Sequence, residues 1–246
     1  MGEAMRIVRL LLVGAMGTAL VGASAQGGSP VTPAALAGEW SGSLAGTLPL
    51  VLHVQADASG ALTATMDSPT QGANGLAGAN AKLAGSSVSF EIPLVKGVFT
   101  GTVGADGKTI SGTWTQEAMQ GQSEPLEWKQ TKTAAQAAAE MAKVKPSAID
   151  GDWTGSLNAG GQTLRLAFHF HTVPGDTGDT IRGTMDSVDQ NAMGIPCGKV
   201  TVDGRKVAVE VPAAKGIYEG TLSADGKTIT GTWSQGTPVE LDLTRK

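Results

Sequence analysis

The sequence contains two copies of one pattern, and this duplication restricts the possible folds more than any other feature. The stretch "GEWSGSL" at 38–44 returns as "GDWTGSL" at 151–157, and "KGVFTGTVGADGKTISGTWTQ" at 96–116 returns as "KGIYEGTLSADGKTITGTWSQ" at 215–235. The repeated unit is far longer than the unit of a solenoid array. The sequence therefore predicts a tandem duplication of a whole domain, over 36–132 and 150–246.

Within each copy, apolar and polar side chains alternate along short segments, which is typical of half-buried β-strands. Clear examples are "LPLVLHV" at 48–54 and "TISGTWTQ" at 109–116, and "ADGK" is a common hairpin turn. We expect about eight short strands per copy, each with one apolar face. This pattern predicts an all-β protein built from two small antiparallel up-and-down barrels. A sandwich of the same strands is the main alternative.

The N-terminal segment, residues 1–25, has the composition of a signal peptide. Arg6 and Arg9 precede an apolar run at 10–22, and "ASA" at 23–25 fits the small-residue rule for cleavage before Gln26. An uncleaved anchor is the alternative, but the run is short for a helix that crosses a bilayer. We therefore expect export to the periplasm or beyond, with no membrane attachment after cleavage.

Two segments outside the copies have different characters. Residues 26–35 are predicted to be a flexible lead-in, whereas residues 133–149 are rich in Ala, Gln and Glu and predict a short helical linker that Pro146 ends.

The formal net charge of −4 gives no sign of nucleic-acid binding. Cys197 is the single cysteine, so no disulfide forms within the chain; we expect a small buried residue and not a nucleophile.

The residue types needed for known catalytic sites are absent or badly placed. The three histidines are His53, His169 and His171, and the first two occupy equivalent outward positions in the copies. Strand tracing places His53 in the half of the barrel away from Ser68, so a Ser-His pair is not expected. Neither a G-x-S-x-G elbow nor a zinc motif is present, and we expect no metal, no cofactor and no enzymatic activity.

A polar stretch, "TMDSPTQGANG" at 65–75, returns as "TMDSVDQNAMG" at 184–194. Strands of alternating direction place this loop at one rim of each barrel, opposite the end that holds the Gly-x-Trp. The candidate ligand residues at the rims are Asp67, Ser68, Gln71, Lys96, Trp114 and Gln116, and Asp186, Ser187, Gln190, Lys215, Trp233 and Gln235. The rims either bind a small molecule, peptide or glycan, or merely close the turns through local hydrogen bonds.

The Gly-x-Trp of the first strand, with Trp40 and Trp153, resembles the first-strand signature of calycin barrels, the lipocalin and avidin group. In that group a late basic residue covers the tryptophan at the closed end of the barrel. The resemblance implies this structural role for Lys132 and Arg245. Such a cation over an indole ring contributes about 0.5–2 kcal/mol.

A second resemblance covers nearly all of both copies. The series G-x-W-x-G-x-L, M-D-S-x-x-Q and G-T-x-x-x-D-G-K-x-I-x-G-T-W-x-Q resembles the N-terminal β-domain of secreted bacterial α/β-hydrolases of the serine esterase and peptidase type. No hydrolase domain follows the second copy in this sequence, so no catalytic residue carries over. The expected function is non-enzymatic binding. The alternative is an accessory domain of a secreted serine hydrolase, which acts in substrate binding or protein contact.

Overall fold

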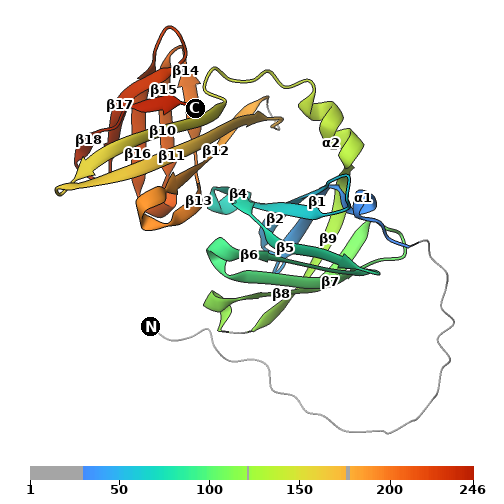
Figure 1. The fold of residues 1–246 in the computed structure, drawn as a ribbon. Helices are drawn as coiled ribbons and strands as arrows, with labels where there is room; N and C mark the ends of the chain where they lie inside the picture. Colours follow the sequence, from blue (N-terminus) through green and yellow to red (C-terminus); the bar gives the residue numbers. More distant parts are fainter. Residues whose placement is uncertain (1–29, 121, 176–177) are drawn as a thin grey trace, which may run out of the picture.

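The computed structural model describes residues 30–120, 122–175 and 178–246, which form two β-domains and a linker (Figure 1). The predicted signal peptide and residues 26–29 lie outside the described residues. Both domains are antiparallel, and each is one continuous sheet that curls into a nearly closed barrel. The predicted tandem of all-β barrels is therefore confirmed, in preference to two stacked sheets.

Domain 1 has nine strands in the order β4-β3-β2-β1-β9-β8-β7-β6-β5. They are β1 (Gly38–Leu44), β2 (Leu48–Ala56), β3 (Leu62–Ser68), β4 (Ala73–Ala77), β5 (Ala79–Ala84), β6 (Ser87–Ile92), β7 (Gly97–Val103), β8 (Thr109–Gln116) and β9 (Ser123–Thr133). Short 3-10 turns at one end of the barrel join three strand pairs: η1 (Pro69–Gln71), η2 (Pro93–Val95) and η3 (Glu117–Met119).

Domain 2 repeats this arrangement, with its strands in the order β13-β12-β11-β10-β19-β17-β16-β15-β14 and β18 paired to β17. They are β10 (Gly151–Ala159), β11 (Gln162–Val173), β12 (Thr180–Ser187), β13 (Ala192–Pro196), β14 (Val200–Asp203), β15 (Lys206–Val211), β16 (Gly216–Leu222), β17 (Thr228–Ser234), β18 (Pro238–Glu240) and β19 (Leu243–Arg245). The equivalent turns are η4 (Val188–Gln190) and η5 (Pro212–Ala214).

The expected eight strands per copy was wrong, because two strands are interrupted. The fourth expected strand is split at Gly78, whose N–H donates to the Ala64 carbonyl at 2.8 Å. Before this point β4 pairs with β3, and after it β5 pairs with β6. The chain thus crosses from one edge of the sheet to the other and almost closes the barrel. In domain 2 the last strand is also divided, into β18 and β19, so the second sheet has ten strands.

The hairpin between β7 and β8 shows how the sequence fixes a turn. The Asp106 carboxylate accepts hydrogen bonds from the backbone N–H groups of Lys108 and Thr109 at 2.9 and 3.1 Å. Gly107 has a φ of 65°, a left-handed conformation that glycine adopts without steric cost. The repeated Ala-Asp-Gly-Lys segment therefore specifies this turn in both domains.

The apolar face of each sheet points into the barrel, and aromatic rings fill most of the interior. In domain 1, Phe90 stacks on Phe99 with ring centroids 5.1 Å apart, and Trp128 meets Phe99 edge-on. Trp114 lies across Gly97, where a Cβ atom would overlap the indole ring. Trp233 lies across Gly216 in the same way. A glycine is therefore needed at positions 97 and 216, because the tryptophan occupies the space of a side chain.

A short helix, α1 (Pro33–Leu36), covers the end of domain 1 opposite the 3-10 turns, in contrast to the predicted flexible lead-in through residue 35. Leu36 is buried, and its carbonyl accepts a hydrogen bond from the Trp40 indole at 2.8 Å. In domain 2 the Ile149 carbonyl accepts the equivalent bond from Trp153 at 2.7 Å. The residues just before each Gly-x-Trp strand therefore belong to the barrel core.

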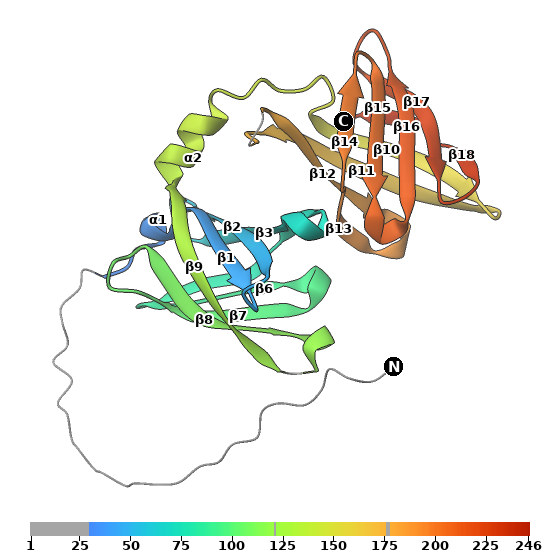
Figure 2. The ribbon, with the colours of Figure 1, turned by 180° about the vertical axis from the view of Figure 1, so that it is seen from behind.

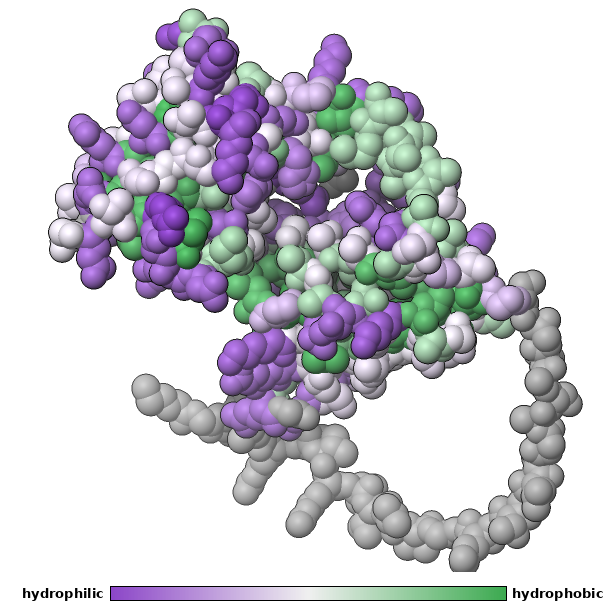
Figure 3. All heavy atoms as spheres, in the orientation of Figure 1, coloured by the Kyte–Doolittle hydropathy of each residue, from purple (hydrophilic) through white to green (hydrophobic). Residues whose placement is uncertain are grey.

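The linker contains helix α2 (Ala134–Met141), as its composition predicted. Thr133 and Gln136 form a reciprocal capping box at its start. The chain then arches over to domain 2, so that β4 of domain 1 lies beside β12 and β13 of domain 2 (Figures 1 and 2). The surface in Figure 3 mixes polar and apolar patches, with a hollow between the two domains below the α2 arch.

Candidate functional site

The repeated Met-Asp-Ser motif has three separate structural roles, one for each residue. The Met66 side chain is buried in the core of domain 1. Asp67 points to the outer face, where its Oδ1 accepts a hydrogen bond from Gly75 N–H at 2.7 Å. The Ser68 hydroxyl donates to Gln71 Oε1 at 2.7 Å and closes the η1 turn. Ser187 donates to Gln190 at the same distance in domain 2.

The other predicted rim residues also make local contacts. Lys96 has a φ of 48° after η2 and forms an ion pair with Glu117 in η3. The Trp114 indole donates to Gln116 Oε1 at 3.3 Å. Gln116 and Lys96 meet at this end because Gly97 pairs with Gln116.

In domain 2 the Gln235 amide donates to the Ala214 carbonyl at 2.5 Å, Trp233 is buried, and Lys215 has a φ of 48°. The structure thus places the predicted residues at one rim, except for the outward-facing Asp67 and Asp186. The Ser-Gln hydrogen bonds of both rims close turns, as in the structural interpretation of the motif, and the Lys96 and Gln235 contacts join neighbouring strand ends.

The interior of domain 1 leaves little room for a ligand. Its void has a volume of about 20 Å³ and lies between α1 and the strands β2, β3, β5 and β6. A void of this size holds about one water molecule, which needs on the order of 10–15 Å³, whereas a small-molecule pocket spans about 300–1,000 Å³. Binding by this domain must therefore use an outer surface.

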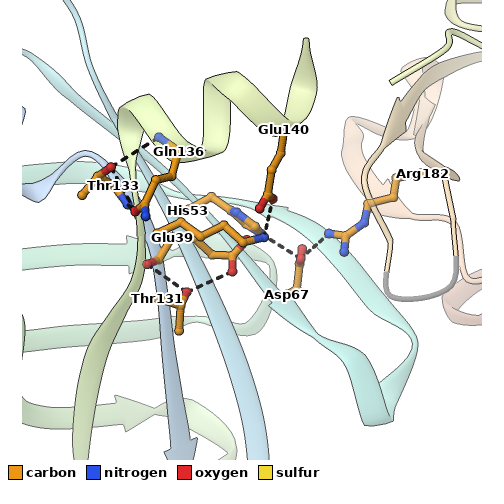
Figure 4. Close-up of polar contacts among 9 residues, drawn as sticks. Glu39, His53, Asp67, Thr131, Thr133, Gln136, Glu140 and Arg182 are labelled. Atoms are coloured by element: carbon orange, nitrogen blue, oxygen red, sulfur yellow. Dashed lines mark hydrogen bonds and ion pairs between the residues drawn. The ribbon is translucent and has the colours of Figure 1, made fainter. Parts of the chain in front are cut away.

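One outer surface of domain 1 carries a polar cluster at the boundary with domain 2, shown in Figure 4. Asp67 Oδ2 lies 2.9 Å from Nε2 of His53 on the neighbouring strand. The same oxygen accepts a hydrogen bond from Nη1 of Arg182, which reaches across from β12 of domain 2. Only 1% of the Asp67 side chain remains exposed, compared with 28% of the Arg182 side chain, so the carboxylate end of this ion pair is buried between the domains.

This geometry corrects the predicted position of His53. Strand tracing had placed it in the half of the barrel away from Ser68, but His53 contacts Asp67, which immediately precedes Ser68. The register explains the error, because Asp67 pairs with Val51, only two residues before His53. A Ser-His catalytic pair is still not formed, since the Ser68 hydroxyl donates to Gln71.

Domain 2 repeats the carboxylate and histidine on its own outer face. Asp186 Oδ2 lies 3.0 Å from His169 Nε2, and Asp186 Oδ1 accepts from Gly194 N–H at 2.7 Å. The other ring nitrogen of His169 lies 2.7 Å from Asp152. The result is a histidine held between two carboxylates, which we call the Asp-His-Asp cluster: Asp152, His169 and Asp186.

The two clusters shift the protonation of their members. Burial would raise the pKa of Asp67, but hydrogen bonds from His53 and Gly75 and the charge of Arg182 lower it to about 2. Burial would lower the pKa of His169, but the hydrogen bonds to Asp152 and Asp186 raise it above 6.5. The pKa of His171 is lowered, first by partial desolvation of its ring by the surrounding protein and then by the Arg182 charge, although the residue is exposed.

The cation over the first-strand tryptophan is present in domain 2. The guanidinium carbon of Arg245 lies 4.4 Å from the centroid of the Trp153 ring. Arg245 also donates to the carbonyls of Ala148 and Asp150, so it ties the strand end to the residues before β10.

In domain 1 the register corrects the expected partner. Trp40 pairs with Gln130, as Trp153 pairs with Arg245, so Gln130 and not Lys132 is equivalent to Arg245. Gln130 donates to the Ala35 carbonyl at 3.3 Å. Lys132 instead forms ion pairs with Glu39 at 3.3 Å and with Glu140 of α2 at 2.8 Å. Both contacts raise the pKa of Lys132, and the hydrogen bond to Glu140 has the largest effect. Lys132 therefore anchors the linker helix.

A second outer surface of domain 1 is hollowed over β5, β6, β7 and β8. The depression has a volume of about 530 Å³. Six hydroxyl side chains line it: Ser87, Ser89, Thr100, Thr102, Ser111 and Thr113. The glycines at 101 and 112 pair with each other across β7 and β8, and Lys82 stands at the β5 side. We call this surface the hydroxyl depression.

The equivalent surface of domain 2 is charged. The strand registers place Lys206 at the position of Ser87, Ala208 at that of Ser89 and Glu219 at that of Thr100. Only the positions of Thr102, Ser111 and Thr113 keep a hydroxyl residue, as Thr221, Thr230 and Thr232. The neutral hydroxyl face is therefore a property of domain 1 alone.

Sequence reasoning missed the outer faces as candidate sites. The signal was present, since most outward positions of three consecutive strands in domain 1 carry Ser or Thr, with Glu91 and Val98 as the exceptions. No pattern pointed to Arg182, because its contact with Asp67 joins residues that lie 115 positions apart.

Cys197 is buried at the position of Gly78 and its N–H donates to the Gly183 carbonyl at 2.9 Å. Burial raises the pKa of its thiol to about 12, in agreement with the expected structural role. Among the described residues, no group of three or more His, Cys, Asp or Glu side chains is arranged to hold a metal ion. No helix in this part of the chain is long and apolar enough to cross a membrane.

Comparison with known proteins gives no family for the chain. No family model matches it, and no curated protein matches it. A solved structure from Bacteroides fragilis, provisionally described as an outer membrane protein, is 14% identical, with a TM-score of 0.24 over 85% of this chain and 95% of that one. A DUF3598 protein of unknown function from Nostoc punctiforme is 12% identical, with a TM-score of 0.22 over 86% and 97%. Values this low do not establish a shared fold or function.

Proposed function

We propose that the protein is an exported, non-enzymatic binding module and that domain 1 binds a neutral glycan in the hydroxyl depression. The observation that carries this proposal is the depression itself, which combines a volume of about 530 Å³ with a lining of neutral hydroxyl groups. Export is proposed from the signal-peptide pattern of residues 1–25.

The chemistry of the depression favours a neutral, hydroxyl-rich ligand. A Ser or Thr hydroxyl both donates and accepts hydrogen bonds, so it matches the hydroxyl groups of a sugar without a charge penalty. Five of the six hydroxyl residues are exposed, and Ser89 is half-buried. The paired glycines at 101 and 112 belong to the inward-facing positions, where a Cβ atom would overlap the buried Phe99 ring, so only their backbone borders the depression. The depression suits a flat, extended ligand, whereas the filled barrel interior does not.

The absence of catalytic geometry on this face supports binding without turnover. The depression contains no histidine or carboxylate in its lining, and its single charged group is Lys82. General acid–base cleavage of a glycosidic bond needs two carboxyl groups that flank the bond. A ligand held here would therefore be bound and not cleaved.

The test is a screen of the mature protein, without residues 1–25, against an array of neutral and acidic glycans, followed by calorimetric titration of the hits. We expect binding to neutral glycans that the Thr100→Glu variant loses, because it places a charge where domain 2 has Glu219. Thr115→Glu is the matched control: it makes the same change on the same outer face, outside the depression. Silence across the neutral glycans, or binding that survives Thr100→Glu, contradicts the proposal.

A further inference from the structure

The two domains hold an aspartate and a histidine in the same geometry, but an arginine contacts only the aspartate of domain 1. In both, a histidine Nε2 contacts Oδ2 of the aspartate, at 2.9 Å in domain 1 and 3.0 Å in domain 2. In both, a glycine N–H eight residues later donates to Oδ1 at 2.7 Å. In domain 1, Oδ2 of Asp67 also accepts from Arg182 of domain 2. Asp186 receives no such guanidinium among the described residues.

Domain 1 has no arginine at the position equivalent to Arg182 that could contact Asp186 of domain 2. Arg182 stands two residues before Thr184, which pairs with His169. The equivalent residue of domain 1, two before Thr65, is Thr63, a short side chain without charge. The Asp186 carboxylate consequently keeps 12% of its side chain exposed, compared with 1% for Asp67.

We propose that the Asp-His-Asp cluster of domain 2 docks an arginine side chain of a partner protein, as Asp67 docks Arg182 within the chain. The cluster adds a second carboxylate, because Asp152 contacts the other ring nitrogen of His169 and is 57% exposed. In domain 1 the equivalent residue, Glu39, is already bound by Thr131 and Lys132. This inference does not depend on the glycan proposal, which concerns a different face of a different domain.

The chemistry of the cluster selects arginine over other cations. A guanidinium group is planar and has five N–H donors, so it can reach a carboxylate on each side of the imidazole ring. A lysine ammonium is a compact charge that satisfies one carboxylate at a time. Arg165, on the same face, is bound to Asp189 through Nε and Nη2 at 3.0 and 2.6 Å, so it does not neutralise the cluster.

The test uses N-acetyl-arginine amide as the probe and the imidazole NMR signals of the full mature chain as the readout. In the natural protein we expect the His169 signals to move and those of His53 to stay in place, because Arg182 fills that site. In Arg182→Ala the domain 1 site becomes vacant, and both histidines should respond. Asp186→Asn should abolish the His169 response while unchanged His53 signals report intact folding.

The Arg182→Ala variant also provides the reference affinity for the probe. In this variant the Asp67 and His53 site, which binds Arg182 in the natural chain, is free to bind the probe. Failure of His169 to respond at probe concentrations that saturate His53 in Arg182→Ala overturns the proposal, and so does failure of His53 to respond in that variant. An equal response to N-acetyl-lysine amide overturns the selection of arginine. Movement of the His169 signals with protein concentration alone, without probe, overturns the assignment to a partner and indicates a second copy of the chain.

Discussion

The two domains share a core and differ on their outer faces. Domain 1 covers its carboxylate and histidine with Arg182 and presents a neutral hydroxyl surface over β5–β8. In domain 2 no guanidinium contacts Asp186 among the described residues and Asp152 is exposed, and Lys206 and Glu219 stand on the equivalent of the hydroxyl surface. Duplication kept the residues that build the barrel and changed those that meet solvent or another molecule. The differences between the copies are therefore the best guide to function.

The largest expected effect concerns what the domains share. Gly97→Ala and Gly216→Ala should each destabilise their own domain by on the order of 3 kcal/mol, because the new methyl group overlaps a buried indole in a packed core. Urea unfolding followed by tryptophan fluorescence measures the loss. The matched control is Gly107→Ala, in an open turn at φ 65°, where only the backbone cost of roughly 1 kcal/mol applies. An equal loss of unfolding free energy in the core and turn variants would contradict the proposed packing of Trp114 and Trp233 against the core glycines.

The next effect separates the buried carboxylate of domain 1 from its counterpart. The pKa of Asp67 is about 2 in the folded chain, below its ordinary value of 3.8. The ionised Asp67 therefore contributes about 2 kcal/mol to the free energy of unfolding above pH 3.8, and this contribution is lost as the pH falls through 2. Asp67→Asn should flatten the acid side of the stability profile between those limits, measured by urea unfolding at several pH values. A profile that keeps its slope would show that the Asp67 network contributes nothing.

The matched control for that measurement is Asp57→Asn. The pKa of Asp57 is also lowered, first by the Ser59 hydroxyl, but this turn residue is exposed to solvent, which screens the interaction. We expect no measurable change in the acid slope for this variant.

The smallest effect concerns the last strand. Arg245→Gln gives domain 2 the residue that domain 1 has at position 130. It should lower the free energy of unfolding by about 1 kcal/mol, because the cation over Trp153 is lost. The glutamine amide keeps a donor for the Ala148 carbonyl. Thermal unfolding of the two variants Arg245→Gln and Arg245→Lys measures it. Lysine should retain part of the stability, since it keeps the charge; a larger loss with lysine would contradict the cation–π interpretation.

Much of the fold could be predicted because its determinants are local or periodic. The alternation of apolar residues gives the strands, the Asp-Gly turn is held by Asp106 within three residues, and the repeat itself predicts two equal domains. The capping residues of α2 are also neighbours in sequence. The position of the repeated polar loop at one end of each barrel follows from the alternating strand direction, whereas its role in ligand binding stays a prediction.

The outer sites could not be predicted, because they depend on register and on how the domains meet. Alternation says that His53 and Asp67 both point outward, but only the pairing of Val51 with Asp67 brings the two side chains into contact. The crossing at Gly78 depends on the Ala64 carbonyl of another strand. Arg182 reaches Asp67 only because β12 lies beside β4.

The sequence by itself therefore determined the duplicated β-architecture, since turns and alternating strands are encoded within a few residues. Tertiary structure alone decided that the Met-Asp-Ser motif divides between core, outer face and turn, and that the two Asp-His pairs have different neighbours. The physical reason is that hydrogen bonds and ion pairs act over about 3 Å in space, whatever the separation along the chain.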